Sequence, residues 1–117
     1  MSSALVEHLR DLLAPWGEVT ARAMFGGYGV YVDGLIIGVI IDEALYLKTD
    51  EQTRDRFAAA GCAPFIYEMK GKPLPMSYWS LPDDAMDSPQ AMQPWARMAI
   101  EAAQRKPARK PRAKRGK

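Results

Sequence analysis

Side chains able to do acid–base, nucleophilic or metal chemistry are few in this sequence, and they stand far apart. His8 is the single histidine and Cys62 the single cysteine of the 117 residues. A zinc site would therefore depend on carboxylates, which are poor zinc ligands on their own. Ser77 lacks the flanking glycines of a nucleophile elbow, so triad chemistry is not indicated. We expect a protein that is not an enzyme, with no catalytic residue, metal, cofactor or small-molecule substrate.

Three further patterns resemble ligand sites but have structural interpretations. Residues 26–29, Gly-Gly-Tyr-Gly, precede a predicted strand and match neither the dinucleotide fingerprint nor the Walker pattern, so a backbone bend is expected. Asp83, Asp84 and Asp87 precede the last predicted helix, where carboxylates favour the positive end of a helix dipole. Cys62 has no basic neighbour in the sequence that would lower its pKa, and we interpret it as a small, partly buried hydrophobe.

The strongest functional signal is the charge of residues 105–117. The 16 Lys and Arg residues divide equally: eight lie in 105–117, which contain no acid, and eight accompany all 14 acids in 1–104. The body thus has a formal charge of −6 and the tail +8. Basic extended segments bind phosphate backbones and release counterions, so we expect sequence-tolerant contact with DNA. The predicted nucleic-acid-binding residues are Arg105, Lys106, Arg109, Lys110, Arg112, Lys114, Arg115 and Lys117.

The composition of this tail also predicts its structure and its behaviour. Lys, Arg, Pro and Ala leave almost nothing to bury, so 105–117 are expected to be a disordered tail on a domain formed by 1–104. A tail of +8 tethered to an acidic body should fold back transiently near Asp83, Asp84 and Asp87. A solubilising role or contact with an acidic partner are the alternatives to DNA.

Three segments have the character of helices. Apolar residues recur at helical spacing in 5–16. Residues 49–52, Thr-Asp-Glu-Gln, match a capping box, which predicts a helix from there to a cap at Gly61. A third helix is expected after Ser88, and Pro94 predicts that this helix either starts nearby or is kinked there.

The remaining apolar segments alternate or cluster as strands do. Asp33-Gly34 reads as a two-residue hairpin turn, and Asp42-Glu43 as another turn. The predicted fold is α+β with two layers, an antiparallel sheet of about five strands covered mainly on one face, and three helices, in the order α-β(3)-α-β(2)-α. The segments with strand character are 18–25, 28–32, 35–41, 44–48, 65–69 and 74–79.

Most aromatic residues fall on these predicted strands. Aromatic rings on an open sheet face can stack nucleic-acid bases or anchor a protein partner. Since only Lys48, Lys70 and Lys72 accompany them and the body is acidic, we favour core or protein-interface roles over base stacking. The residues concerned are Tyr28, Tyr31, Tyr46, Tyr67, Tyr78 and Trp79.

Five stretches of the sequence form a distinctive combination. They are Arg-Ala-Met-Phe-Gly-Gly-Tyr-Gly-Val-Tyr-Val-Asp-Gly at 22–34, Leu-Tyr-Leu-Lys at 45–48, Pro-Phe-Ile-Tyr at 64–67, Met-Ser-Tyr-Trp with Pro82 at 76–82, and Trp-Ala-Arg at 95–97. Together they resemble the N-terminal domain of the TfoX/Sxy family, bacterial regulators of natural competence, over roughly residues 5 to 104. The resemblance implies a fold similar to that of type III secretion chaperones and a dimerisation or interaction module. Full-length family regulators have a second, C-terminal domain, whereas here a basic tail stands in its place.

These observations lead to two hypotheses of function. The first is a competence-regulator-like protein, a homodimer that regulates or assists transcription and contacts DNA through 105–117. The second is a protein- or peptide-binding adaptor, similar in mode to secretion chaperones. The lone cysteine and the absence of a basic start favour the cytoplasm. The longest apolar run, 35–41, is far too short to cross a membrane.

Overall fold

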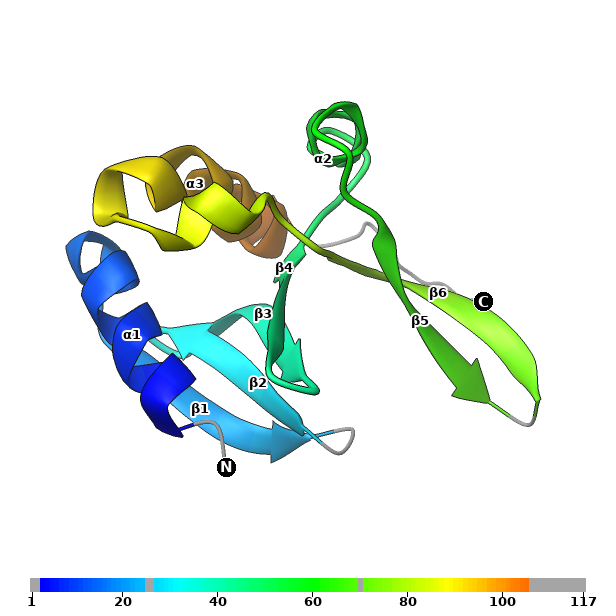
Figure 1. The fold of residues 1–117 in the computed structure, drawn as a ribbon, viewed down its shortest axis with the longest axis horizontal. Helices are drawn as coiled ribbons and strands as arrows, with labels where there is room; N and C mark the ends of the chain where they lie inside the picture. The colour runs from blue at the N-terminus through cyan, green and yellow to red at the C-terminus, as the bar shows by residue number, and fades with distance from the viewer. Residues whose placement is uncertain (1–2, 25–26, 70, 106–117) are drawn as a thin grey trace.

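Within the residues that the structure describes, 3–24, 27–69 and 71–105, the computed structural model contains three α-helices and six β-strands (Figure 1). The helices are α1 (Ser3–Leu13), α2 (Arg54–Ala59) and α3 (Pro89–Arg105). The strands are β1 (Val19–Met24), β2 (Gly27–Val32), β3 (Leu35–Ile41), β4 (Ala44–Lys48), β5 (Pro64–Met69) and β6 (Lys72–Trp79). Two 3₁₀ turns are η1 (Ala14–Trp16) and η2 (Asp83–Met86).

The strands form one antiparallel sheet in the order β1-β2-β3-β4-β6-β5. Helices α1 and α3 lie against one face of this sheet (Figure 1). The predicted α+β class, with an antiparallel sheet and three helices, is therefore confirmed. The sheet has six strands rather than about five, because the alternating segment 44–48 is a full strand. The order is accordingly α-β(4)-α-β(2)-α.

Tight turns with left-handed backbone angles connect the first strands, as predicted. Asp33 and Gly34 have φ of 50° and 83°, and Asp42 and Glu43 have φ of 51° and 65°. Two-residue hairpins favour these angles because they match the twist of the strands. The Oδ1 atom of Asp33 also accepts a hydrogen bond of 2.8 Å from the backbone N–H of Glu18, which closes the turn onto the start of β1.

The glycines before β2 were expected to mark a bend or bulge, and Gly26 lies outside the described residues. The irregularity of the ladder lies farther along β2, between Val30 and Tyr31. Gly27 is required for a different reason. A Cβ atom there would lie 1.9 Å from the carbonyl oxygen of Ile40, so only glycine permits this approach of two backbones.

The core lies between the sheet and the two long helices. Fully buried side chains include Leu9 of α1, Met92 of α3 and Ile37 of β3. Helix α2 adds Phe57, whose ring packs edge-on against Trp95 of α3 at a centroid distance of 5.0 Å. Burying a side chain of this size contributes about 1.5–3 kcal/mol. The core thus positions the sheet, α1 and α3 relative to one another.

Helix α2 begins at Arg54, with Thr53 as its N-cap residue and no side-chain hydrogen bond at that cap. The side chains of Asp50 and Thr53 close the turn that precedes the helix. Asp50 Oδ1 accepts hydrogen bonds from the N–H groups of Gln52 and Thr53, and Thr53 Oγ1 accepts one from the N–H of Asp50. The hydroxyl of Thr49 instead donates to the carbonyl of Ser77 on β6. The predicted capping box at 49–52 is therefore wrong, and the helix starts at Arg54 rather than directly after Thr49.

The predicted end of α2 is confirmed. Gly61 has φ of 87°, and its N–H donates to the carbonyl of Ala58. The N–H of Cys62 donates to the carbonyl of Phe57. These two bonds form a Schellman motif, which satisfies the last carbonyls of the helix.

Helix α3 runs through Pro94 rather than starting at it. The hydroxyl of Ser88 caps the helix by accepting a hydrogen bond of 3.1 Å from the N–H of Ala91. Pro94 is exposed inside the helix, where its missing N–H leaves the carbonyl of Gln90 open to solvent.

Strands β5 and β6 project from the body. Strand β6 pairs with β4 only through Leu47–Trp79 and Lys48–Tyr78. Residues 72–75 of β6 pair with β5, and the carbonyl of Ser77 accepts hydrogen bonds from Thr49, just beyond β4. We call β5 and the part of β6 before Tyr78 the β5–β6 arm; it extends away from the helices as a two-stranded ribbon (Figure 1).

Candidate nucleic-acid interface

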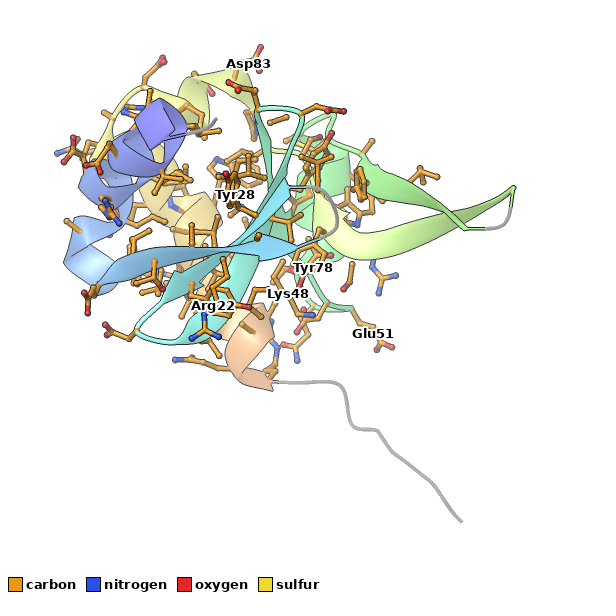
Figure 2. The ribbon with its side chains drawn as sticks, turned by 90° about the horizontal axis from the view of Figure 1, so that it is seen from below. Arg22, Tyr28, Lys48, Glu51, Tyr78 and Asp83 are labelled. Carbon is orange, nitrogen blue, oxygen red and sulfur yellow. The ribbon has the colours of Figure 1, made fainter. Side chains whose placement is uncertain are left out.

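The sheet face away from α1 and α3 carries aromatic and basic side chains. In β4, Leu45 and Leu47 are buried in the core, so Tyr46 and Lys48 point to the opposite side. Figure 2 labels three side chains of this face, Arg22, Lys48 and Tyr78, on three different strands. We call the following set the open face: Arg22, Tyr31, Tyr46, Lys48, Phe65 and Tyr78.

Two cations lie over tyrosine rings on the open face. The Cζ atom of Arg22 is 5.5 Å from the ring centroid of Tyr31, and Nζ of Lys48 is 5.2 Å from that of Tyr78. Such contacts contribute about 0.5–1 kcal/mol each at exposed sites. The tyrosines therefore hold both positive charges at defined places on the sheet.

The open face includes one pair of packed rings and one buried aliphatic side chain. Val39 pairs with Gly29 and Tyr46 in the ladder, so it faces this side, yet its side chain is only 1% exposed. The rings of Tyr46 and Phe65 pack at a centroid distance of 5.1 Å. The face thus carries apolar side chains apart from the core cluster under the helices.

Lys48 and Tyr78 are both partly withdrawn from water. Burial lowers the pKa of Lys48, an effect that nearby Asp50 partly opposes. Burial also raises the pKa of Tyr78, with a smaller contribution from Tyr31. A lysine ammonium that has lost part of its hydration gains more from an approaching anion than a fully solvated one does. Lys48 is thus a partly buried cation of the open face, whose charge is disfavoured by burial and favoured by Asp50.

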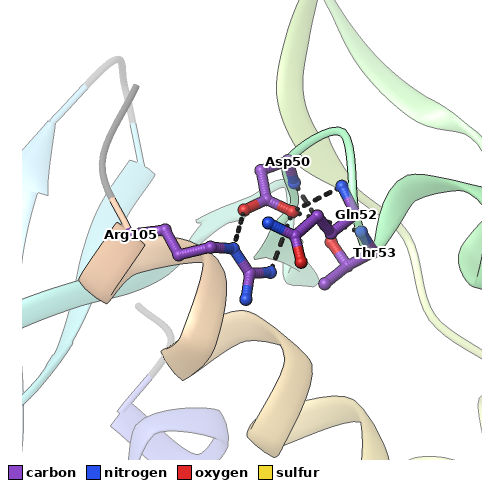
Figure 3. Close-up of polar contacts among 4 residues, drawn as sticks. All are labelled: Asp50, Gln52, Thr53 and Arg105. Atoms are coloured by element: carbon purple, nitrogen blue, oxygen red, sulfur yellow. Dashed lines mark hydrogen bonds and ion pairs between the residues drawn. The ribbon is translucent and has the colours of Figure 1, made fainter. Parts of the chain in front are cut away.

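The end of α3 is tied to the end of β4, next to Lys48. Arg105 donates from Nε to Oδ2 of Asp50 at 2.6 Å and from its terminal nitrogen to Oδ1 at 3.1 Å (Figure 3). These bonds, first among several causes, hold the pKa of Asp50 below its usual value and raise that of Arg105. The same carboxylate accepts the N–H groups of Gln52 and Thr53 in the turn that leads into α2. One aspartate therefore joins β4, α2 and α3.

The structure describes one of the eight predicted nucleic-acid-binding residues. Arg105 is the last residue of α3 and is paired with Asp50, so the predicted disordered tail begins one residue too early. The other seven lie outside the described residues, so their predicted disorder stays a prediction. They are Lys106, Arg109, Lys110, Arg112, Lys114, Arg115 and Lys117.

The acids near which the tail is predicted to fold back lie at the start of α3. Asp83 and Asp84 belong to η2, which precedes this helix, and Asp87 follows η2. Arg105, the last residue of the helix, is paired with Asp50. The residues of the tail beyond Arg105 lie outside the described residues, so their contact with Asp83, Asp84 and Asp87 stays a prediction.

The aromatic residues divide between the two faces of the sheet. Tyr31, Tyr46 and Tyr78 lie on the open face, whereas Tyr28 and Trp79 pack against the core. The side chain of Tyr67 lies outside the described residues. Arg22 and Phe65 were not among the residues considered for this face, although the period of two along each strand could have indicated Arg22.

The dispersed reactive residues have structural contacts. The Nε2 atom of His8 is 2.6 Å from the carbonyl oxygen of Met86, which links α1 to η2. Cys62 is partly buried at the end of α2, and this burial raises the pKa of its thiol, as expected for a structural cysteine. In the part of the chain that the structure describes, His, Cys, Asp and Glu side chains form no group of three placed to hold a metal ion. No described helix has the length and apolar character needed to cross a membrane.

A single antiparallel sheet with helices on one face and a cation-bearing open face defines an α+β domain. Over residues 11–103 the chain matches the family of the TfoX N-terminal domain, and it belongs to this family. The match ends two residues before Arg105, so the basic tail lies beyond it. A search of curated proteins finds no match.

Proposed function

We propose that this TfoX N-terminal domain protein is a non-enzymatic factor that regulates or assists transcription in the cytoplasm. In this proposal it contacts DNA through residues 105–117, with little preference for sequence. The observation that carries the proposal is the concentration of eight basic residues and no acid in this segment. Their charge suits the phosphate backbone, and phosphate contacts do not distinguish one sequence from another.

The place where the tail begins supports this proposal. Arg105 is bonded to Asp50, two residues beyond Lys48 on β4. A phosphate chain held by the tail would therefore meet Lys48, and Arg22 lies on the same open face. Because Arg105 is neutralised by Asp50, seven basic residues in 106–117 remain for phosphates.

The open face favours contact with phosphates over stacking with bases. The rings of Tyr31 and Tyr78 each have a cation over one side. Stacking would have to displace these contacts. The cations themselves need no rearrangement to meet a phosphate oxygen, so DNA contact here adds to that of the tail.

The test is fluorescence anisotropy with two unrelated duplexes across a range of salt concentrations. Seven phosphate contacts give a slope of log K against log salt of at most about −6, from roughly 0.9 per contact. Deleting 106–117, which leaves the Arg105–Asp50 pair intact, should abolish binding. Replacing the seven basic residues by Gln is the matched control for the length of the tail.

Two outcomes would contradict the proposal. Unchanged affinity after deletion of 106–117 would mean that the folded domain binds DNA without the tail. A strong preference for one duplex would mean that bases are read. Lys48→Gln should weaken binding by a smaller factor than the tail deletion and should lower the salt slope by about one contact.

A second candidate function is a protein-binding adaptor. It is favoured by the β5–β6 arm, on which Ile66 exposes 47% of its surface. The discriminating experiment is capture of proteins from the native cell by the chain lacking 106–117. A partner retained by this shortened chain, together with no DNA binding by the intact chain, would favour the adaptor.

A further inference from the structure

The β5–β6 arm has few contacts that would stabilise it within one chain. In β6, only Tyr78 and Trp79 pair with β4, and they follow the arm. The arm itself is a two-stranded ribbon. Isolated two-stranded hairpins are marginally stable in water. Pairing with a further strand would therefore stabilise the arm.

One side of the arm is closed to pairing by prolines. The carbonyl of Ser77 points toward β4, since it accepts the N–H of Thr49 at 2.8 Å. Backbone groups along a strand alternate in direction, so Pro73 and Pro75 point to the same side as Ser77, away from β5. Neither proline has an N–H to donate. Another strand cannot form a full ladder along this side of β6.

The opposite edge of the whole sheet is also partly occupied. Strand β1 is the first strand of the sheet, and Nε of Arg10 in α1 donates to the outward carbonyl of Val19 at 3.3 Å. Helix α1 therefore uses one of the groups that a new strand would need.

The outer edge of β5 is limited by proline only at its first residue, Pro64, which has a carbonyl to offer but no N–H. Ile66 pairs with Pro75 and Glu68 with Pro73 across the arm. Residues paired in an antiparallel ladder point their backbone groups either toward each other or both outward, so Ile66 and Glu68 present theirs on the free edge. Ile66 is also the large hydrophobic side chain that stands exposed among the described residues, at 47%. An exposed strand edge with an apolar side chain invites pairing.

We propose that two copies of this chain associate through β5, which pairs antiparallel with β5 of the second copy, with Ile66 opposite Ile66. A two-fold axis makes this contact self-complementary, because one edge serves both copies. In this register the outward groups of Ile66 bond to each other and the two isoleucine side chains meet. Glu68, the acid of the strand, lies opposite Pro64 rather than opposite itself. A single strand pair buries little area, so the expected Kd is of micromolar order.

This inference does not depend on DNA binding by the tail. Sedimentation of the full chain from about 1 to 100 µM should give a monomer–dimer equilibrium. Glu68→Pro removes an outward N–H and no bond to β6, and it should weaken association at least about tenfold while the far-UV circular dichroism is unchanged. The matched control is Ala23→Pro on β1, at an outward position of the opposite edge, which should leave association unchanged.

A cross-link tests the register and keeps the proposal testable if Glu68→Pro fails to fold. Residues opposite each other in a hydrogen-bonded pair have Cα atoms about 5.5 Å apart, which suits a disulfide. In a Cys62→Ser background, Ile66→Cys should therefore form a disulfide-linked dimer on mild oxidation, whereas Ala58→Cys on α2 should not. A chain that stays monomeric throughout the range, a dimer equally strong in Glu68→Pro and wild type, or equal cross-linking at both cysteines would overturn the proposal.

Discussion

Replacing Asp50 by Ala tests whether one carboxylate joins β4, α2 and α3. The substitution removes the acceptor for the N–H groups of Gln52 and Thr53, at 3.0 and 3.1 Å, and the partner of Arg105. Loss of a side-chain acceptor at the start of a helix costs about 0.5–2 kcal/mol, typically about 1. We expect Asp50→Ala to lower the free energy of unfolding by about 1–2 kcal/mol at pH 7, the ion pair adding a minor part.

Urea denaturation followed by circular dichroism measures this change, with an expected shift of the midpoint of roughly 1 M. Asp50→Asn is the matched control because an amide oxygen still accepts these N–H groups but the charge is lost. It should cost less than Asp50→Ala, and Arg105→Gln should resemble it. Equal losses for Asp50→Ala and Arg105→Gln would refute the reasoning, since the hydrogen bonds of the turn would then contribute nothing.

The dependence on pH separates the charge from the hydrogen bonds of the turn. Hydrogen bonding from Arg105 holds the folded pKa of Asp50 below its usual value. For a depressed carboxyl pKa, the stabilisation is fully present above the unfolded pKa of about 3.9 and is lost as pH falls through the folded value. The advantage of wild type over Asp50→Asn should therefore be constant near neutral pH and disappear in acid. A difference that persists at the lowest pH would contradict an electrostatic origin.

Three further substitutions test the fold. Ile40→Ala should lower the free energy of unfolding by about 2–5 kcal/mol, because Ile40 is only 1% exposed in the core; an unchanged urea midpoint would place the strand wrongly. Glu43→Gly should stabilise by about 1 kcal/mol, because Glu43 has φ of 65°, and a lower Tm in calorimetry would count against this. Gly27→Ala should lower the Tm by more than about 4 °C, because its Cβ would meet the carbonyl of Ile40; a Tm equal to that of wild type would disprove the close approach.

The predictions from the sequence succeeded where the signal was local. Turn residues such as Asp33-Gly34 and the cap at Gly61 require particular backbone angles, and the structure has them. The start of α2 differs from the prediction because it depends on a contact with a residue far away in the sequence. Thr49 fits the capping pattern, but its hydroxyl bonds to Ser77, 28 residues away. Asp50 and Thr53 close a turn instead, and the helix begins only at Arg54. A pattern of four residues carries no information about a hydrogen bond to such a distant residue.

The sequence predicted the charge of the candidate site but not its position in the fold. Counting charges identified the basic tail, and no local rule could indicate that Arg105 would extend α3 and pair with Asp50, 55 residues earlier. The sequence indicated only part of the open face. Tyr31, Tyr46, Tyr78 and Lys48 were considered for such a face, whereas Arg22 and Phe65 were not, because the members come from β1, β2, β4, β5 and β6. Strand order brings Arg22 and Tyr31 to the same surface as Lys48 and Tyr78, and this order depends on the global fold.

The Arg105–Asp50 pair fixes the point from which residues 106–117 would reach DNA in the proposed contact. These twelve residues span at most about 40 Å, from about 3.3–3.6 Å per residue. One turn of B-DNA rises about 34 Å, or roughly 10 base pairs. Starting beside Asp50, residues 106–117 would therefore follow little more than one turn of duplex. If they carry the contact as proposed, duplexes shorter than one turn should lose affinity with each base pair removed.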